Sequence, residues 1–177
     1  WFTARSGKVN VISSTGSMIM TFGAYGTGNG QFILPRGLML DSDSRLWVAD
    51  TSNNRLQIFS SAGTHLTNIG SSSPLHGLLH YPRGLRAYSD TVIVSDRYFG
   101  RIEFLSPDGS YQNTILLEDP DLTNPYSDAD PSDVLRDASG NVYVLSQSQR
   151  MLFKYDSNGT LLTSTSLPHH VKLPRYT

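Results

Sequence analysis

The sequence contains no cysteine. This absence excludes disulfide bonds, thiolate-ligated metal sites and a cysteine nucleophile. Lysine is scarce, with three residues against eleven arginines, and the formal net charge is −1. A charge this close to zero gives no field that would draw the chain onto nucleic acid or an anionic membrane. A surface rich in serine and threonine but poor in lysine favours an extracellular or cell-surface location, with the cytoplasm as the alternative.

Long apolar runs and helical patterns are missing as well. No stretch approaches the run of about 18 apolar residues that a membrane-spanning helix needs. No segment keeps its apolar residues at the period of about 3.6 that marks an amphipathic helix. The sequence starts at Trp1 without a signal-peptide pattern, so we expect that an upstream segment was removed or left out.

The chain repeats itself with a period of about 47 residues, which is the strongest sequence signal. The motif Pro-Arg-Gly-Leu at 35–38 recurs at 82–85, 47 positions later. The segments that follow this motif recur at nearly the same spacing. A weaker copy spans 131–159, and a partial copy lies at 8–16. The chain is therefore expected to consist of similar structural units.

Each copy contains four short apolar-rich stretches separated by turn residues. In the best-preserved copy these stretches are 36–41, 45–49, 55–60 and 64–69. Four short strands per repeat of forty-odd residues is typical of β-propellers. A single four-stranded sheet cannot bury both of its faces, so such sheets stack around an axis. We therefore predict an all-β chain built of four-stranded antiparallel blades.

The best-preserved copy resembles the NHL repeat. The resemblance rests on Gly28–Phe32, Pro35–Leu38 and Leu46–Leu56, and it continues through Phe59 and Gly63. The match is specific because many positions agree at fixed spacing. The next copy also matches well, whereas the third is degenerate. The resemblance implies a β-propeller of the NHL type along essentially the whole chain.

The resemblance also implies where the blades begin and end. The expected divisions are the end of one blade at 1–23, blades at 24–70 and 71–116, a degenerate blade at 117–166 and the start of another at 167–177. NHL propellers usually have six blades, and these divisions amount to about three and a half. We therefore expect the chain to be part of a six-bladed ring. A compact four-bladed ring is the alternative.

Opposite charges occupy two equivalent positions in the repeats. These positions hold Asp50 and Arg55, then Asp96 and Arg101, and in the third copy Ser146 and Met151. The third copy loses both charges together, as expected for ion pairs, because a partly buried charge without its partner is costly. We predict structural ion pairs here rather than catalytic carboxylates. The resemblance implies that each pair ties the turn between the second and third strands.

Some NHL-type propellers are enzymes, so a metal-dependent lyase or hydrolase is an alternative function. The peptidyl-hydroxyglycine amidating lyase binds zinc through histidines that directly follow the blade proline. The matching positions here are Arg36, Arg83 and Ser132, none of which replaces a neutral imidazole. Ligands for such an activity would have to lie in blades that this sequence does not include. We predict no catalytic residue, no metal ligand and no cofactor within this chain.

Three other stretches could suggest ligand sites. His76 and His80 have the spacing of a helical zinc site, but they lack the intervening glutamate. The glycine-rich stretch 23–30 lacks the following helix that would favour phosphate binding. The acidic stretch 118–133 could suit calcium, but its spacing is irregular and prolines interrupt it. We interpret all three stretches as connections between blades.

The remaining candidate is a binding surface. In propellers, the connections between blades share one face with the turns between second and third strands. The predicted surface residues are Arg36, Arg83, Arg97, Tyr98 and Phe99. Exposed aromatic residues beside arginines are typical interface anchors, whereas packing of Tyr98 and Phe99 against the neighbouring connection is the alternative.

These features predict a non-enzymatic binding or scaffold module that contacts a protein or glycan, in a larger extracellular assembly. RNA binding through Arg36 and Arg83 is a further alternative. The near-neutral charge and the acidic stretch 118–133 disfavour it, because phosphate contacts dominate such affinity. Asn158 begins an Asn-Gly-Thr triplet, which is a formal glycosylation acceptor.

Overall fold

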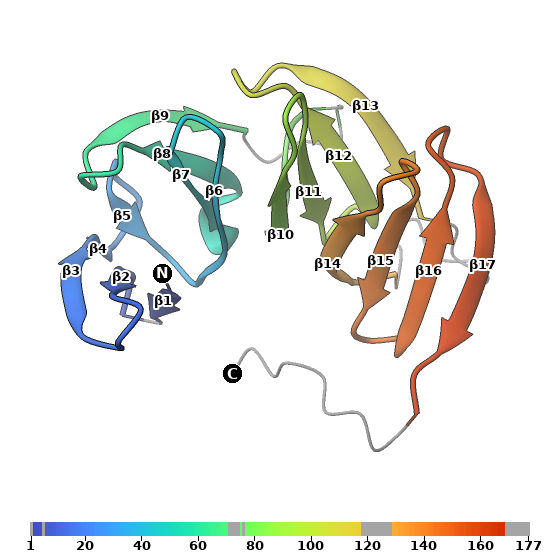
Figure 1. Cartoon of the computed structure of the whole chain (residues 1–177), viewed down its shortest axis with the longest axis horizontal. Coiled ribbons are helices and arrows are strands. Elements are labelled where there is room, and N and C mark those ends of the chain that lie inside the picture. Colours follow the sequence, from blue (N-terminus) through green and yellow to red (C-terminus); the bar gives the residue numbers. More distant parts are fainter. Residues whose placement is uncertain (1, 5, 71–74, 76, 118–128, 169–177) are drawn as a thin grey trace.

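The computed structural model describes residues 2–4, 6–70, 75, 77–117 and 129–168, which form an almost purely β structure (Figure 1). The strands are β1 (Phe2–Ala4), β2 (Lys8–Ile12), β3 (Met18–Phe22), β4 (Ala24–Tyr25), β5 (Gln31–Phe32), β6 (Pro35–Leu40), β7 (Leu46–Asp50), β8 (Arg55–Phe59), β9 (His65–Ile69), β10 (Pro82–Ala87), β11 (Val92–Asp96), β12 (Arg101–Leu105), β13 (Tyr111–Leu116), β14 (Pro131–Arg136), β15 (Val142–Ser146), β16 (Met151–Tyr155) and β17 (Leu161–Ser166). A short 3-10 helix, η1 (Thr51–Asn53), joins β7 to β8. Within the described ranges, no helix is long and apolar enough to cross a membrane.

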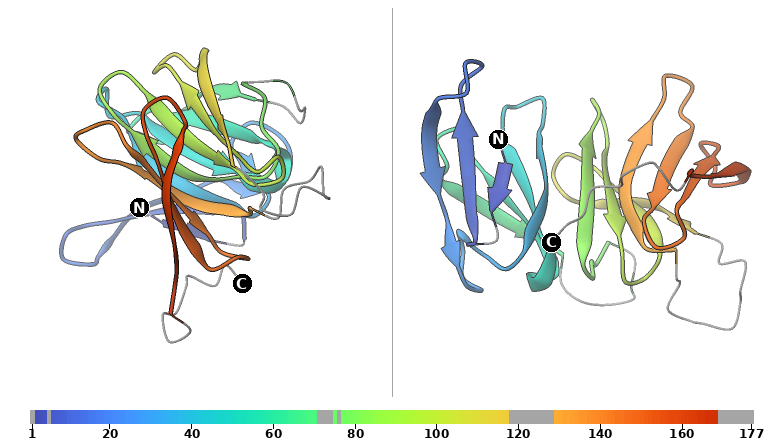
Figure 2. Two further views of the ribbon diagram at one scale, coloured as in Figure 1. Left: turned by 90° about the vertical axis from the view of Figure 1, so that its right-hand side faces the viewer. Right: turned by 90° about the horizontal axis from the view of Figure 1, so that it is seen from below.

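Three four-stranded antiparallel sheets follow one another along the chain. Their strand orders are β6-β7-β8-β9, β10-β11-β12-β13 and β14-β15-β16-β17. Strands β1 to β3 form a three-stranded sheet, and β4 pairs with β5 in parallel. Strand β10 contacts β6 on one side and β14 on the other, and the sheets stand side by side with their first strands innermost (Figures 1 and 2). The prediction of four-stranded propeller blades is confirmed.

Glycines shape the hairpin between the last two strands of each of these three- and four-stranded sheets. Gly16, Gly63, Gly109 and Gly159 have φ values of 84°, 80°, 90° and 89°. Residues with a Cβ rarely adopt this left-handed conformation, so the recurring glycine is a requirement of the turn. In the second sheet from the N-terminus, the Gly63 amide donates to the Ser60 carbonyl at 2.9 Å, which closes the turn.

The hydrophobic core lies between neighbouring sheets. One cluster joins the sheet β6–β9 to the sheet β10–β13, and its buried members are Trp47, Ala49, Leu56, Ile58, Leu79, Leu85, Val92, Val94 and Leu105. A second cluster joins β10–β13 to β14–β17, and a third joins β1–β3 to β6–β9. Neighbouring blades therefore bury the faces that they turn toward one another, because apolar area is removed from water only when blades stack.

The inner strands approach too closely for a side chain at one position of the repeated motif. A Cβ added at Gly37 would lie 2.0 Å from the Arg83 carbonyl oxygen of the next blade. At the equivalent Gly84, the added Cβ would lie 2.9 Å from the Cα of Asp133. The glycine of Pro-Arg-Gly-Leu is therefore required by the close contact between inner strands.

Candidate binding face

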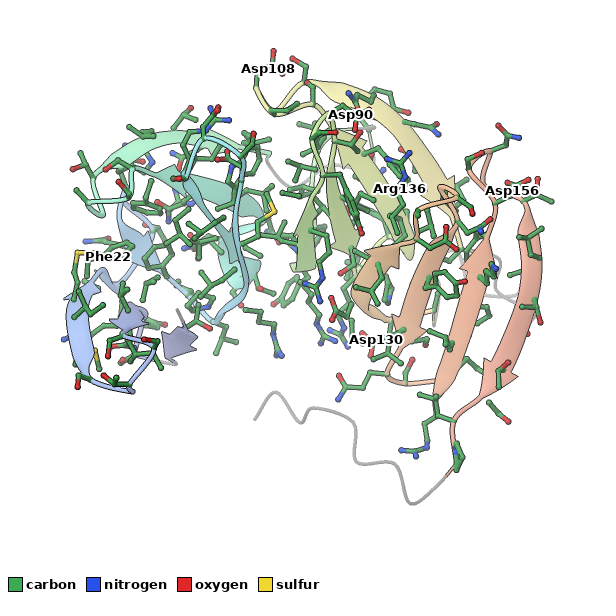
Figure 3. The ribbon with its side chains drawn as sticks, viewed as in Figure 1. Phe22, Asp90, Asp108, Asp130, Arg136 and Asp156 are labelled. Carbon is green, nitrogen blue, oxygen red and sulfur yellow. The ribbon has the colours of Figure 1, made fainter. Side chains whose placement is uncertain are left out.

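The turn after β11 lies against the connection that leads into β10. The amide of Tyr98 donates to the His80 carbonyl at 3.1 Å, and the amide of Arg97 donates to the Tyr81 carbonyl at 3.4 Å. We call the end of the blades formed by these turns and connections the candidate face. Figure 3 shows Asp130 at this end and Asp90, Asp108 and Asp156 toward the other.

A left-handed residue precedes the proline at the start of each inner strand. Leu34, Tyr81 and Asp130 have φ values of 50°, 59° and 34°. Such values are strained for residues other than glycine and persist only where surrounding contacts hold them. The sharp bend presents the carbonyl groups of Tyr81 and Asp130 to the neighbouring turns, which donate amides to both. The bend thereby fixes the connection against the turn.

Four aromatic rings meet on the candidate face, and we call them the aromatic group: His80, Tyr81, Tyr98 and Phe99. His80 stacks on Tyr98 with ring centroids 4.0 Å apart and an interplanar angle of 13°. Phe99 packs edge-on against both of these rings. Tyr98 still exposes 40% of its surface, so packing on the connection and exposure to solvent both occur. Burial lowers the pKa of His80, which favours the neutral ring at pH 7.

The predicted arginines differ in their surroundings. Arg83 is buried, and its Nη1 lies 3.1 Å from Asp130 Oδ1 and 3.5 Å from Gln147 Oε1. Arg97 donates to the same carboxylate oxygen through Nε and keeps a more exposed side chain. Arg83 therefore links two blades, and Arg97 is the more accessible cation. Arg36 is partly buried on β6.

Asp50 is fully buried and accepts hydrogen bonds from several directions. Its carboxylate receives the Ile33 amide at 2.9 Å, Asn53 Nδ2 at 2.8 Å, Arg55 Nε at 2.9 Å and Gln57 Nε2 at 2.9 Å. These bonds join the connection, the turn and two strands. A carboxylate that accepts four hydrogen bonds from these segments holds them together.

The next blade carries a different set at the same positions. Asp96 accepts the His80 amide at 3.0 Å and Arg101 Nε at 3.0 Å. Glu103 occupies the position of Gln57, and its Oε1 lies 2.8 Å from Arg101 Nε. Both carboxylates are fully buried, and we call them the buried acid pair. Burial raises the pKa of Asp96 to about 7; Arg101 opposes this shift, whereas Glu103 adds to it.

The third full blade replaces the whole set with uncharged residues. Ser146, Met151 and Phe153 stand where the preceding blade has Asp96, Arg101 and Glu103. Glu103 is absent from the site residues predicted from the sequence, although an alignment of the repeats at this position would identify it. His80 was considered there only as a possible metal ligand, whereas its ring stacks on Tyr98.

Several of the suggested ligand sites fall partly outside the described residues. His76 and residues 118–128 of the acidic stretch are outside them, as is the segment 169–177. Within the described part of the chain, no three histidine, aspartate or glutamate side chains are grouped closely enough to hold a metal ion.

Comparison with known proteins supports the repeat and the fold. The NHL repeat family model matches residues 32–59. The protein brain tumor of Drosophila melanogaster is 26% identical over 158 residues, which is 85% of this chain and 14% of that protein. The protein lin-41 of Caenorhabditis elegans is 45% identical over 49 residues, 28% of this chain and 4% of that protein.

A streptogramin B lyase structure has a TM-score of 0.70 and 16% identity, covering 96% of this chain and 51% of that one. At this identity the likeness shows the fold alone. The chain thus spans a small part of the two sequence relatives and about half of the lyase.

Proposed function

The chain is an NHL-repeat protein of the β-propeller family, and from this premise we propose that it is a non-enzymatic module that binds a protein partner through the candidate face. The observation that carries the proposal is the stack of Tyr98 on His80 with 40% of Tyr98 exposed. A tyrosine held in one orientation loses little side-chain entropy on binding, and it offers both an apolar ring and a hydroxyl.

The neighbouring charges support the same use. Arg97 lies in the same turn as Tyr98, and its side chain keeps 40% of its surface exposed beside Asp130. An arginine at the edge of an aromatic anchor is a common feature of protein interfaces. We further propose that the module works outside the cell or at its surface. Glycosylation of the exposed Asn158 would test this location.

The test compares two large side chains of similar exposure. Tyr98 exposes 40% of its surface on the candidate face, whereas Leu40 exposes 46% at the end of β6, the end of that strand away from Pro35. Proximity labelling in cells that express the wild type, Tyr98→Ala or Leu40→Ala would identify the neighbouring proteins. We expect a subset of partners to disappear with Tyr98→Ala and to remain with Leu40→Ala. Identical partner sets for all three would refute the proposed face.

A further inference from the structure

The aromatic group is built directly on the buried acid pair. The Asp96 carboxylate accepts a hydrogen bond from the backbone amide of His80, and the His80 ring stacks on Tyr98. The Arg101 guanidinium lies 4.8 Å from the centre of the Phe99 ring. Arg101 also donates to the carbonyl oxygens of Leu75, at 3.2 Å, and Leu78 in the connection before β10. Asp96 and Arg101 therefore hold the connection and contact the aromatic group at His80 and Phe99, and Glu103 contacts Arg101.

These groups carry an unbalanced charge when both acids are ionised. Asp96 and Glu103 expose none of their side chains, and Arg101 exposes 2%. Two carboxylates and one guanidinium leave one negative charge in a region that excludes water. Such a charge is costly to bury, so proton uptake by the pair is favoured when the blade is closed.

The neighbouring blade shows that the second acid is not required by the fold. Gln57 occupies the place of Glu103, donates to Asp50 at 2.9 Å and accepts the Gly30 amide at 2.9 Å. That set holds one carboxylate and one arginine, and its charges balance. The acid pair is therefore a particular feature of the blade that bears the aromatic group.

The other titratable or charged groups near the pair face elsewhere. On β10 and in the turn after β11, Arg83 and Arg97 contact Asp130. On β13, Thr114 donates to Glu103 Oε2 at 2.7 Å and is uncharged. His80 contributes its backbone amide, and its ring lies on Tyr98. Arg101 contacts both carboxylates of the pair directly.

We propose that the Asp96–Glu103 pair is a proton-responsive latch: a proton bound by the pair holds residues 77–81 and the aromatic group in place, and its loss loosens them. The proposal rests on the proposed function for its biological meaning, since the aromatic group is the surface through which a protein partner would be bound. Partner binding would accordingly be stronger slightly below neutral pH than above it.

The direction of the pH dependence follows from proton linkage. The pKa of Asp96 is raised from 3.8 to about 7 in the folded blade, and it returns toward 3.8 when the connection opens. The stabilisation is fully present below the lower value and is lost as pH rises through the higher one. One linked proton changes the opening equilibrium by at most about tenfold per pH unit.

Hydrogen exchange tests this without any partner. Protection factors of the described amides at 77–81, corrected for intrinsic exchange, would be measured from pH 5.5 to 8 in the wild type and in Glu103→Gln. We expect the wild-type factors to fall by several-fold to tenfold per pH unit up to about pH 7. The Glu103→Gln variant should lose part of this dependence, since the charge of Glu103 adds to the burial that raises the pKa of Asp96. Its melting temperature should exceed that of the wild type by about 2–4 °C at pH 8. Equal pH dependence in both proteins would overturn the proposal.

A second measurement keeps the test independent of the variant. In the wild type labelled with ¹³C at aspartate carboxyl groups, the Asp96 resonance should titrate near neutral pH. A spectrum in which every aspartate carboxyl titrates below pH 5.5 would overturn the latch. If instead the latch is observed but Tyr98→Ala loses no partner, the proposed function fails and the latch stands as a property of the blade.

Discussion

Replacing Arg101 alone is expected to lower the free energy of unfolding far more than replacing Asp96, Arg101 and Glu103 together. Arg101 exposes 2% of its side chain and is the cation in direct contact with two fully buried carboxylates. Arg101→Met introduces the residue found at the equivalent position of the next blade, where Met151 stands. The single change leaves Asp96 and Glu103 buried without their cation.

The magnitude follows from the burial of these groups. Breaking a buried ion pair by deleting one partner typically costs about 3–5 kcal/mol, because the remaining charge stays buried. Replacing the complete set by apolar groups is often neutral or stabilising. The triple variant Asp96→Ser, Arg101→Met and Glu103→Phe reproduces the set of the next blade, so it should recover most of the loss.

Urea denaturation at pH 8, above the pKa of about 7 of Asp96, measures the free energy of unfolding of each protein. Arg86→Met is a matched control, because Arg86 pairs with Asp133 at 2.8 Å but both side chains are more than a third exposed. An exposed pair of this kind is worth about 0–1 kcal/mol. If Arg101→Met costs no more than Arg86→Met, or if the triple variant is as unstable as the single one, the structural role assigned to this ion pair is wrong.

Other predictions concern the inner strands, the contact between blades and the surface. Gly37→Ala should lower the free energy of unfolding by about 1–3 kcal/mol or more, since its Cβ would lie 2.0 Å from the Arg83 carbonyl oxygen; an unchanged urea midpoint would contradict this packing. Tyr88→Phe removes the hydroxyl that accepts the Arg136 amide at 2.6 Å and donates to the Arg136 carbonyl at 3.1 Å. It should cost about 1–3 kcal/mol in the same assay, and no measurable loss would argue against this bridge. Asn158 is exposed in the turn before β17, so protein secreted from eukaryotic cells should lose mass on treatment with an N-glycosidase; an identical mass before and after would exclude the modification.

The architecture was predictable because propeller repeats impose local requirements on sequence. The turn glycines, such as Gly63, need a left-handed φ of 80°, and they recur wherever the hairpin recurs. Short strands separated by such turns produce a signal that spacing alone reveals. For the same reason, the separation of five residues between Asp50 and Arg55 pointed to contact across a strand turn, where the structure has them 2.9 Å apart.

Contacts between blades were less predictable, because no local pattern encodes them. The contact of Arg83 with Asp130 joins residues 47 positions apart, and Asp130 had been grouped with an acidic stretch of the connection. The need for glycine at position 37 depends on the backbone of the next inner strand. The stack of Tyr98 on His80 likewise depends on how one connection lies against one turn. These relations become visible only when neighbouring blades are placed together.

The most direct test of the account is the affinity of a purified partner for the wild type, Tyr98→Ala and Leu40→Ala, measured by biolayer interferometry at pH 6.5. The partner would be one that proximity labelling finds around the wild type. The account predicts that Tyr98→Ala weakens binding by at least about tenfold, because a central aromatic anchor is lost, whereas Leu40→Ala leaves the affinity within about twofold. Equal affinities for all three, with melting curves showing that each variant is folded, would contradict the claim that this face binds the partner.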